Sequence, residues 1–272
     1  MLQRHNFFSM KFNDKTVWIT GASSGIGEAL AHAFSDEGAD VVLSARSEKK
    51  LEEIRQLIEK KGRKAWVLPL DLADTESVKT AASRVETLVP AVDILVHCGG
   101  ISQRSRVHET LLEVDRRIME VNFFGTIALT KEVLPRMLAR KKGHIVVISS
   151  VMGKIGFPVR SAYAASKHAL HGFFETLWTE YHRDGIDVTM VCPGMVRTNI
   201  SYHSLEGDGK EHGVMDPRQA GGISPEKCAR KIIRAVKRKR HEVYIGKEQI
   251  LIYLRRYIPC LFFAIVSKFK PT

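Results

Sequence analysis

The sequence has 272 residues, of which 44% are hydrophobic and 26% are charged, proportions typical of a globular protein that buries one large core. The length therefore favours one α/β domain over two. Much of the formal net charge of +12 lies between residues 227 and 240, but no zinc-finger, RNP or helix-turn-helix pattern accompanies it, which argues against a nucleic-acid partner.

Cysteine usage and the first residues of the chain indicate a reducing compartment. The four cysteines, at positions 98, 192, 228 and 260, form no Cys-x-x-Cys pair, so the sequence predicts neither a disulfide framework nor a metal site. Residues 1–8 contain no long apolar run and no small-residue cleavage site, so we expect no secretory signal. These features predict a cytoplasmic protein.

Strand-like and helix-like stretches alternate along the chain. The predicted strands are residues 16–20, 41–44, 66–70, 94–96, 145–149, 188–191 and 242–245. The predicted helices are residues 29–35, 48–61, 75–88, 111–140 and 161–183. Short apolar strands separated by helices pair in parallel through right-handed crossovers, with helices on both faces of the sheet. The sequence therefore predicts a Rossmann-like, doubly wound α/β fold of about seven parallel strands in a single domain, with its ligand beyond the carboxyl ends of the strands.

A glycine-rich turn, Gly21-Ala22-Ser23-Ser24-Gly25-Ile26-Gly27, follows the first predicted strand. Glycine permits a positive φ and lets the backbone approach a ligand closely. The helix that follows presents unpaired N–H groups and the positive end of its dipole to a phosphate. At this place in an alternating chain, the turn favours a dinucleotide site.

A tyrosine and a lysine four residues apart, Tyr163 and Lys167, fall on one face of the predicted helix 161–183. A nearby ammonium favours the phenolate, so we expect the pKa of Tyr163 to fall below its usual value of about 10. A tyrosine so tuned can act as a general acid or base. The hydroxyl of Ser150, at the end of a predicted strand, would hold a carbonyl oxygen beside it. Taken alone, this spacing more often marks a packed ring and a solvated ammonium.

The end of the second predicted strand bears on the choice of cofactor. NAD-preferring dinucleotide folds place an acidic residue there for the ribose 2′-hydroxyl, whereas an arginine accommodates a 2′-phosphate. This chain has no acid there but has Arg46, whose guanidinium can bind a phosphate in bidentate fashion, with Ser47 or Ser23 as further donors. The sequence therefore predicts NADP(H), with NAD(H) as the alternative; in the simplest other interpretation, Arg46 only caps a solvated helix start.

Six motifs occur in the order and at the spacing of one enzyme family, and they span most of the chain: Thr20 to Gly27, Asp71-Leu72, Asn122, Ser150, Tyr163-x-x-x-Lys167, and Pro193-Gly194-Met195-Val196-Arg197-Thr198. Over residues 15–245 the sequence thus resembles the short-chain dehydrogenase/reductase family. Residues 101–105 and 153–171 are similar to its dehydrogenase/reductase member 7-like branch of lipid-, steroid- and retinoid-type carbonyl reductases.

The resemblance implies four catalytic residues. Tyr163 would exchange a proton with the substrate oxygen, and Ser150 would orient that oxygen. Lys167 would hold the nicotinamide ribose and lower the pKa of the tyrosine, and Asn122 would support a water relay to the lysine. The cofactor contacts that the resemblance implies are Gly21, Ser23, Ser24, Gly25, Ile26, Gly27, Arg46, Ser47, Asp71, Leu72, Gly99, Tyr163, Lys167, Pro193, Gly194, Val196 and Thr198.

One motif departs from the family. Where the family usually has Asn-Asn-Ala-Gly, this chain has His97-Cys98-Gly99-Gly100. A histidine can still donate and accept hydrogen bonds, so we expect a local rearrangement and a preserved site. We expect Cys98 to be a structural thiol. Likewise, Asp71 would contact adenine by resemblance, although an aspartate after a strand is often only a helix cap.

The resemblance implies that the substrate binds under residues 199–225, a glycine-containing segment that we predict to be a mobile lid. Its large side chains, which include Tyr202, His203, Leu205 and Met215, would face Met152, Phe157 and Pro158 across the pocket. This mixture favours an apolar carbonyl or alcohol over a sugar or a polyanion.

The two ends of the chain lie outside the predicted catalytic domain of residues 15–248: an extension, residues 1–14, and a tail, residues 249–272. The tail is apolar, but two arginines and a proline break it up too much for a spanning helix. It would lie in a membrane interface, cover the substrate pocket or pack in an oligomer interface.

Two functions follow from these features. The first is an NADP(H)-dependent oxidoreductase that transfers a hydride between nicotinamide and a carbonyl or secondary alcohol. The second is a catalytically silent dinucleotide-binding regulatory or scaffold protein of the same fold. The resemblance also implies a homodimer or homotetramer that pairs through the helices around residues 122–139 and 161–183.

Overall fold

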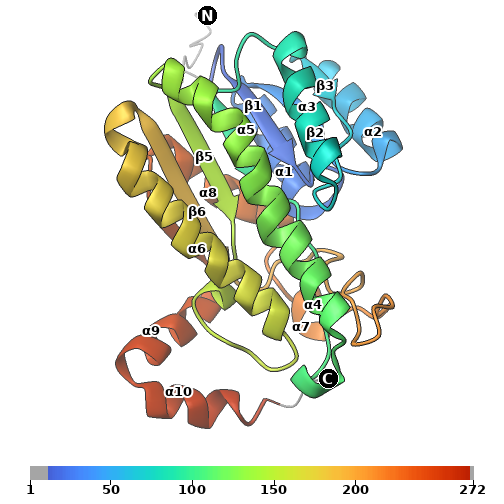
Figure 1. Ribbon diagram of the computed structural model, residues 1–272, viewed down its shortest axis with the longest axis vertical. Helices are drawn as coiled ribbons and strands as arrows, with labels where there is room; N and C mark the ends of the chain where they lie inside the picture. Colours follow the sequence, from blue (N-terminus) through green and yellow to red (C-terminus); the bar gives the residue numbers. More distant parts are fainter. Residues whose placement is uncertain (1–11, 270–272) are drawn as a thin grey trace, which may run out of the picture.

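The computed structural model describes residues 12–269, and the predicted doubly wound sheet is confirmed. Its seven strands are all parallel and lie in the order β3-β2-β1-β4-β5-β6-β7 (Figure 1). They are β1 (Thr16–Thr20), β2 (Asp40–Ser44), β3 (Ala65–Val67), β4 (Ile94–His97), β5 (Gly143–Ile148), β6 (Ile186–Pro193) and β7 (Glu242–Ile245). The strand order reverses between β1 and β4, which places the expected ligand crevice at their carboxyl ends.

Helices cover both faces of the sheet. The longer ones are α1 (Gly25–Asp36), α2 (Glu48–Glu59), α3 (Thr75–Leu88), α4 (Leu112–Met119), α5 (Gly125–Ala139), α6 (Ser161–Tyr181) and α8 (Pro225–Lys237). Figure 1 shows α5 and α6 in front of β5 and β6, with α8 behind the sheet. A short helix, α7 (Pro217–Ala220), lies in the predicted lid segment.

Side chains alternate between two cores because successive residues of a strand point to opposite faces. Val17 and Ile19 of β1 join the core beneath α1, α2 and α8, whereas Trp18 between them joins the core beneath α3, α5 and α6. All three side chains are fully buried. The near-continuous apolar runs of β1, β4 and β5 follow from this two-sided burial.

Two observed elements differ from their predicted bounds. The strand predicted at residues 66–70 ends at Val67, and Pro69, which has no N–H to donate to a ladder, follows it. The single helix predicted at residues 111–140 is divided into α4 and α5 by a π-helical turn, Glu120–Phe124, which contains Asn122. Most of the predicted N-terminal extension lies outside the described residues.

The tail forms two short helices, α9 (Ile250–Tyr257) and α10 (Pro259–Val266), separated at Ile258. Pro259 at the start of α10 cannot continue the hydrogen-bond ladder of α9, which explains the break. In Figure 1, α9 and α10 extend from the base of the molecule, away from the sheet. Among residues 12–269, no helix is long and apolar enough to cross a bilayer. We call residues 250–266 the C-terminal arm.

Candidate active site

The glycine turn between β1 and α1 approaches the end of β4 closely. Gly21 and Gly25 have φ of +65° and +58°, values that disfavour other residues, and a Cβ on Gly21 would lie 2.7 Å from the backbone nitrogen of Gly99. Thr20 Oγ1 accepts hydrogen bonds from the N–H groups of Cys98 at 3.1 Å and Gly99 at 3.2 Å. The turn is therefore held against β4, and Ser23, Ser24, Gly25 and Ile26 line a cavity at the rim of the sheet.

The start of α1, after this turn, has the chemistry to accept an anion. Ser24 is the N-cap residue of α1, but its side chain makes no capping hydrogen bond, which leaves the first turn of the helix without that partner. Gly27 differs from the other predicted contacts because it does not line the cavity, and a Cβ on it would overlap the carbonyl oxygen of Gly21. Its role is close packing of helix against turn.

Two basic residues follow β2, one in the loop after the strand and one in the first turn of α2. Arg46 and Lys50 both line the cavity and are exposed to solvent. Among residues 12–269, the Arg46 guanidinium forms no hydrogen bond or ion pair, so no carboxylate there competes for it. Ser47 is the N-cap residue of α2, but its side chain makes no capping hydrogen bond. Ser47 also lines the cavity.

Asp71 and Leu72 line the same cavity after β3. The Asp71 carboxylate accepts a hydrogen bond from the N–H of Ala73 at 2.9 Å, so it stabilises a local turn; the cap of α3 is Asp74. Leu72 packs closely on the backbone around it, since a Cβ on Gly99 would lie 2.6 Å from its side chain. Both residues are thus held firmly, Asp71 by a turn and Leu72 by packing.

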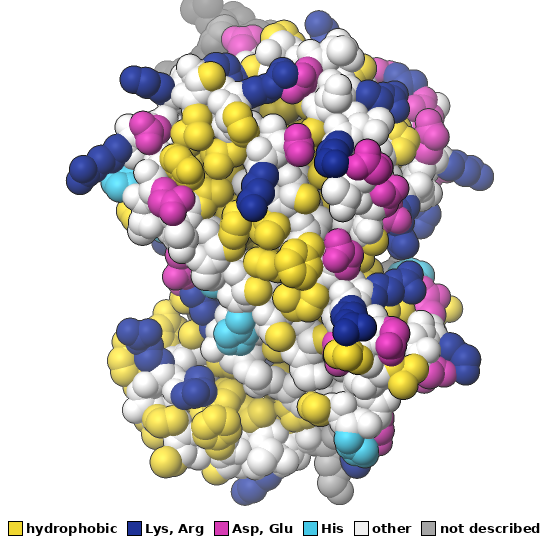
Figure 2. Space-filling model, viewed as in Figure 1, with side chains coloured by type: hydrophobic (Ala, Val, Ile, Leu, Met, Phe, Trp, Pro, Cys, Tyr) yellow, Lys and Arg dark blue, Asp and Glu magenta, His cyan; other side chains and the backbone are white. Residues whose placement is uncertain are grey.

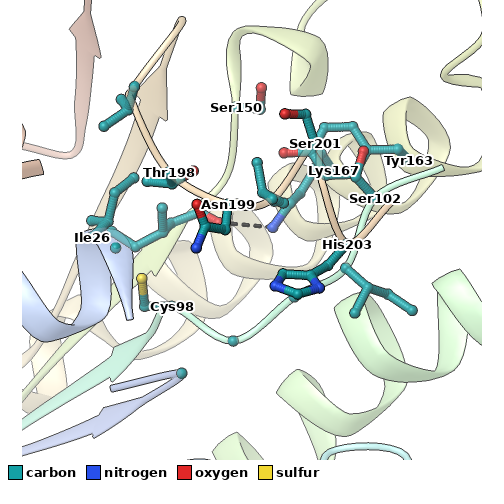
Figure 3. A pocket seen from close by; sticks show the side chains of 18 of the residues that line it. Ile26, Cys98, Ser102, Ser150, Tyr163, Lys167, Thr198, Asn199, Ser201 and His203 are labelled. Atoms are coloured by element: carbon teal, nitrogen blue, oxygen red, sulfur yellow. Dashed lines mark hydrogen bonds between the residues drawn. The ribbon is translucent and has the colours of Figure 1, made fainter. Parts of the chain in front are cut away.

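Tyr163, Lys167 and Ser150 face one another at the inner end of the cavity (Figure 3). The Lys167 ammonium lies 5.8 Å from the centre of the Tyr163 ring, and it donates a hydrogen bond to the carbonyl of Ile148 at 2.9 Å. Ser150 Oγ accepts from the N–H of Met152 at 3.1 Å and also interacts with the Tyr163 hydroxyl. The helical spacing on α6 therefore does bring the tyrosine and lysine to one side.

The expected lowering of the tyrosine pKa is wrong for this structure. Burial raises the pKa of Tyr163, and this effect exceeds the opposing influence of the Ser150 hydrogen bond and of Arg160. Burial also lowers the pKa of Lys167 to about 8, so burial disfavours the charged form of the lysine as well. The phenol is consequently the form of Tyr163 at neutral pH.

Asn122 lies behind this group and not in the cavity wall. Its side chain is fully buried, accepts from the N–H of Ile101 at 2.8 Å, and donates to the carbonyl of Ile101 at 2.9 Å and to Ser166 Oγ at 3.0 Å. It ties the π-helical turn to the segment after β4 and to α6. The side-chain amide is thereby committed to structural hydrogen bonds.

The substituted motif begins with His97, the last residue of β4. His97 is buried, and its Nε2 is hydrogen-bonded to Thr130 Oγ1 at 2.8 Å, while its Nδ1 has no partner among the described residues. Burial, followed by the charge of Lys167, lowers the pKa of His97 to about 3. Burial raises the pKa of Cys98 to about 12, which disfavours the reactive thiolate, and this half-buried side chain lines the cavity.

His97 should make the fold sensitive to acid. Between its unfolded pKa of 6.5 and its folded pKa of about 3, the unfolded chain binds more protons, so stability falls as the pH falls. We expect wild type to lose about 2 kcal/mol more than His97→Asn between about pH 7 and about pH 5. Urea unfolding of both proteins at the two pH values measures this difference, and parallel losses would contradict it.

The predicted lid is anchored on the cavity at several points. Leu205 accepts from the N–H of Arg104 at 2.7 Å and donates its own N–H to Ser102 at 2.8 Å. Leu205 and His203 line the cavity, and Met152, Phe157 and Pro158 lie in its wall as expected. Tyr202 is exposed, however, and neither it nor Met215 is among the lining residues of the described chain. Mobility of this segment stays a prediction.

Sequence reasoning missed a buried charge cluster beside Tyr163. Arg104 forms an ion pair with Asp216 at 2.9 Å, and this pairing holds the pKa of Asp216 low although burial opposes it. Arg160 is also buried and donates to the carbonyl of Gln103; burial and the nearby Arg104 lower its pKa to about 10. No local pattern signals this cluster, because its members lie on three separate segments.

A second missed cluster lies behind the site, where His171, Cys192 and Glu242 bring their ligand atoms within 4.8 Å of one another. Lys154 donates to Glu242 at 2.7 Å and so already balances this carboxylate. Ser149 Oγ lies 3.1 Å from His171 Nε2, which connects the cluster to the end of β5. The ion pair here is that of Lys154 with Glu242, whereas burial lowers the pKa of His171 to about 4 and raises the pKa of Cys192.

Known proteins with similar sequences and structures cover most of this chain. A sequence profile described as short chain dehydrogenase matches residues 15–208. "Dehydrogenase/reductase SDR family member 7B" of Xenopus laevis is 43% identical over 259 residues, which are 92% of this chain and 80% of the frog protein. The crystal structure of a short-chain dehydrogenase from Streptomyces avermitilis shares 29% identity at a TM-score of 0.79, covering 93% of this chain and 97% of the other. An alcohol dehydrogenase from Thermococcus sibiricus, complexed with 5-hydroxy-NADP, shares 27% identity at a TM-score of 0.73, covering 85% and 95%.

Proposed function

Because this chain belongs to the short-chain dehydrogenase/reductase family, whose members are oxidoreductases acting on CH–OH and C=O groups, we propose that it reduces an apolar ketone or aldehyde with NADPH. One observation carries the proposal. A single cavity of about 840 Å³ is lined by the glycine turn and Arg46 at one end and by Ser150, Tyr163 and Lys167 at the other. A dinucleotide along the rim would thus reach the tyrosine.

The residues of the rim fit a nicotinamide dinucleotide. The start of α1, which follows the glycine turn, offers its N–H groups to a pyrophosphate. Asp71 and Leu72 would flank the adenine, and Arg46 with Ser47 would bind a ribose 2′-phosphate. At the other end, Gly99, Pro193, Gly194, Val196 and Thr198 would contact the nicotinamide half.

In the reducing direction, Tyr163 would act as the proton donor. A phenol that stays protonated at neutral pH can donate its proton to a carbonyl oxygen as negative charge develops there. Ser150, which interacts with the same hydroxyl, would hold that oxygen in place. Lys167 would hold the nicotinamide ribose, and Asn122 would position the turn behind it. When bound, the nicotinamide supplies the hydride.

Substrate chemistry is suggested by the cavity beyond Tyr163. Met152, Phe157 and Pro158 form one side, Leu205 covers it, and Leu251 and Phe269 come from the tail. These apolar side chains favour an apolar carbonyl compound, and the Arg104–Asp216 ion pair and Arg160 line the same cavity. Pairing of two or four copies through α5 and α6 stays a prediction from the family resemblance.

A graded panel of carbonyl compounds tests this function. We expect NADPH oxidation to accelerate from short polar aldehydes to long-chain and polycyclic ketones, because each buried apolar group adds binding energy. The Tyr163→Phe variant provides the background rate. A response at that background for every compound, from protein that still binds NADPH, would favour the regulatory or scaffold function instead.

A further inference from the structure

The C-terminal arm has more apolar surface than its own protein buries. Every residue of α10 from Pro259 to Val266 is apolar, yet only Phe262 and Val266 are buried. A helix that is apolar on all sides is normally enclosed by protein or lipid. Here one side is enclosed by the protein, and the other faces outward.

The inner side fixes where the arm lies. Ile252, Phe262 and Val266 form one buried cluster with Val151 and Ile155, which follow β5. Leu251 of the arm, and Phe269 just after it, line the substrate cavity. The arm is thus packed on the cavity wall, and its outer side is held in a set direction beside the cavity.

The outer side presents a cluster of large side chains to solvent. Their exposed fractions range from 45% for Leu261 to 72% for Tyr257, with 56% for Phe263. Single exposed apolar residues are ordinary, whereas a contiguous group marks an interaction site. Figure 2 shows yellow side chains gathered at the lower left, where Figure 1 places α9 and α10, with basic side chains among them. The exposed members of the arm are Ile250, Tyr253, Tyr257, Ile258, Leu261 and Phe263.

The charges of the arm identify its partner. No acidic residue occurs after Glu248, whereas Arg255 and Arg256 in the arm and Lys268 just after it are basic. The Arg255 guanidinium lies 5.2 Å from the centre of the Phe263 ring, so cation and apolar surface adjoin. Anionic lipid headgroups attract such cations while the apolar side chains enter the acyl boundary. Two copies of the arm placed face to face would instead bring like charges together.

We propose that the C-terminal arm is a peripheral membrane anchor, which lies in the plane of a bilayer containing anionic lipids. An eight-residue helix is about 12 Å long, far shorter than the hydrocarbon core, so the arm lies in the interface and does not cross it. Because the arm also lines the cavity, docking brings the substrate cavity next to the lipid. This consequence rests on the proposed function: an apolar carbonyl compound would enter from the membrane.

Vesicle sedimentation of the full chain tests the anchor without any need for turnover. We expect at least about tenfold more binding to phosphatidylcholine vesicles containing phosphatidylserine than to pure phosphatidylcholine vesicles, and weakening of this binding by salt. The double variant Leu261→Ser with Phe263→Ser should bind at least about tenfold more weakly, because two side chains no longer enter the acyl region. A matched control, Leu111→Ser with Leu112→Ser, removes an equally exposed pair elsewhere and should bind as wild type does.

Three results would overturn the anchor. The first is wild-type protein that does not sediment with the anionic vesicles, and the second is an equal loss in the control pair. The third is an arm variant that forms a smaller oligomer by light scattering while its vesicle binding is unchanged. That result would mean that the outer side of the arm contacts a second copy of the chain. NADPH binding by each variant, measured in parallel, shows that the fold persists. Vesicle binding without turnover on any carbonyl would reject the proposed function and leave the anchor intact.

Discussion

Replacing Tyr163 with phenylalanine should lower the rate of carbonyl reduction by about 10³-fold and leave the affinity for NADPH nearly unchanged. The variant removes one oxygen atom, and the ring that faces the Lys167 ammonium remains. The lost oxygen is the proposed proton donor, whose hydroxyl also interacts with Ser150. Single-turnover rates with saturating NADPH, together with a fluorescence titration of the cofactor, measure the two effects separately.

A second tyrosine provides the control for this experiment. Tyr202, in the segment over the cavity, is 42% exposed and does not line the cavity, so Tyr202→Phe should retain the wild-type rate. Retention of more than about a tenth of the wild-type rate by Tyr163→Phe would exclude this residue as the principal acid. Loss of NADPH binding in the same variant would instead indicate a structural role for the hydroxyl.

Replacing Arg46 with aspartate should reverse the cofactor preference. Wild type should bind NADPH more tightly than NADH, because a guanidinium without a competing carboxylate is available to the 2′-phosphate. In Arg46→Asp a carboxylate would repel that phosphate and accept from a ribose hydroxyl, so the affinity ratio should change by about 100-fold toward NADH. Titration of wild type and variant with both cofactors gives the ratio directly.

The control for Arg46 is the same charge reversal away from the cavity. Arg238 is exposed at the end of α8 and does not line the cavity, so Arg238→Asp tests for an effect of net charge alone. The interpretation of Arg46 fails if wild type prefers NADH, or if both substitutions change the affinity ratio equally.

The family and the order of helices and strands can be predicted from the sequence. Both depend on motifs and on hydrophobic repeats among neighbouring residues. Apolar runs of strand length, the glycine turn and the spacing of Tyr163 and Lys167 are properties of neighbouring residues. Helix geometry then brings residues four apart to one face in any context, which is why this pair was found. The branch assignment is confirmed by the frog relative, and the strand order follows the doubly wound pattern.

Departures from expectation occur where distant segments decide the outcome. The pKa of Tyr163 rises because the fold encloses the ring, an effect that a lysine four residues away does not reveal. The amide of Asn122 is committed to Ile101, 21 residues earlier in the chain, so it does not line the cavity. The ion pair between Arg104 and Asp216 joins residues 112 positions apart.

The tail also combines a property visible in the sequence with one that only the tertiary structure decides. Its apolar and basic composition is visible in the sequence and allowed three interpretations, a membrane interface, a pocket cover and an oligomer interface. Only the tertiary structure separates the side chains of α10 into Phe262 and Val266, which pack beside the cavity, and Leu261 and Phe263, which face outward. The sequence by itself determined the fold class and the family, because strand and helix periods and motif spacing are local properties. Burial, charge pairing and the direction of an exposed face were decided by the tertiary structure, because each depends on which remote segments meet.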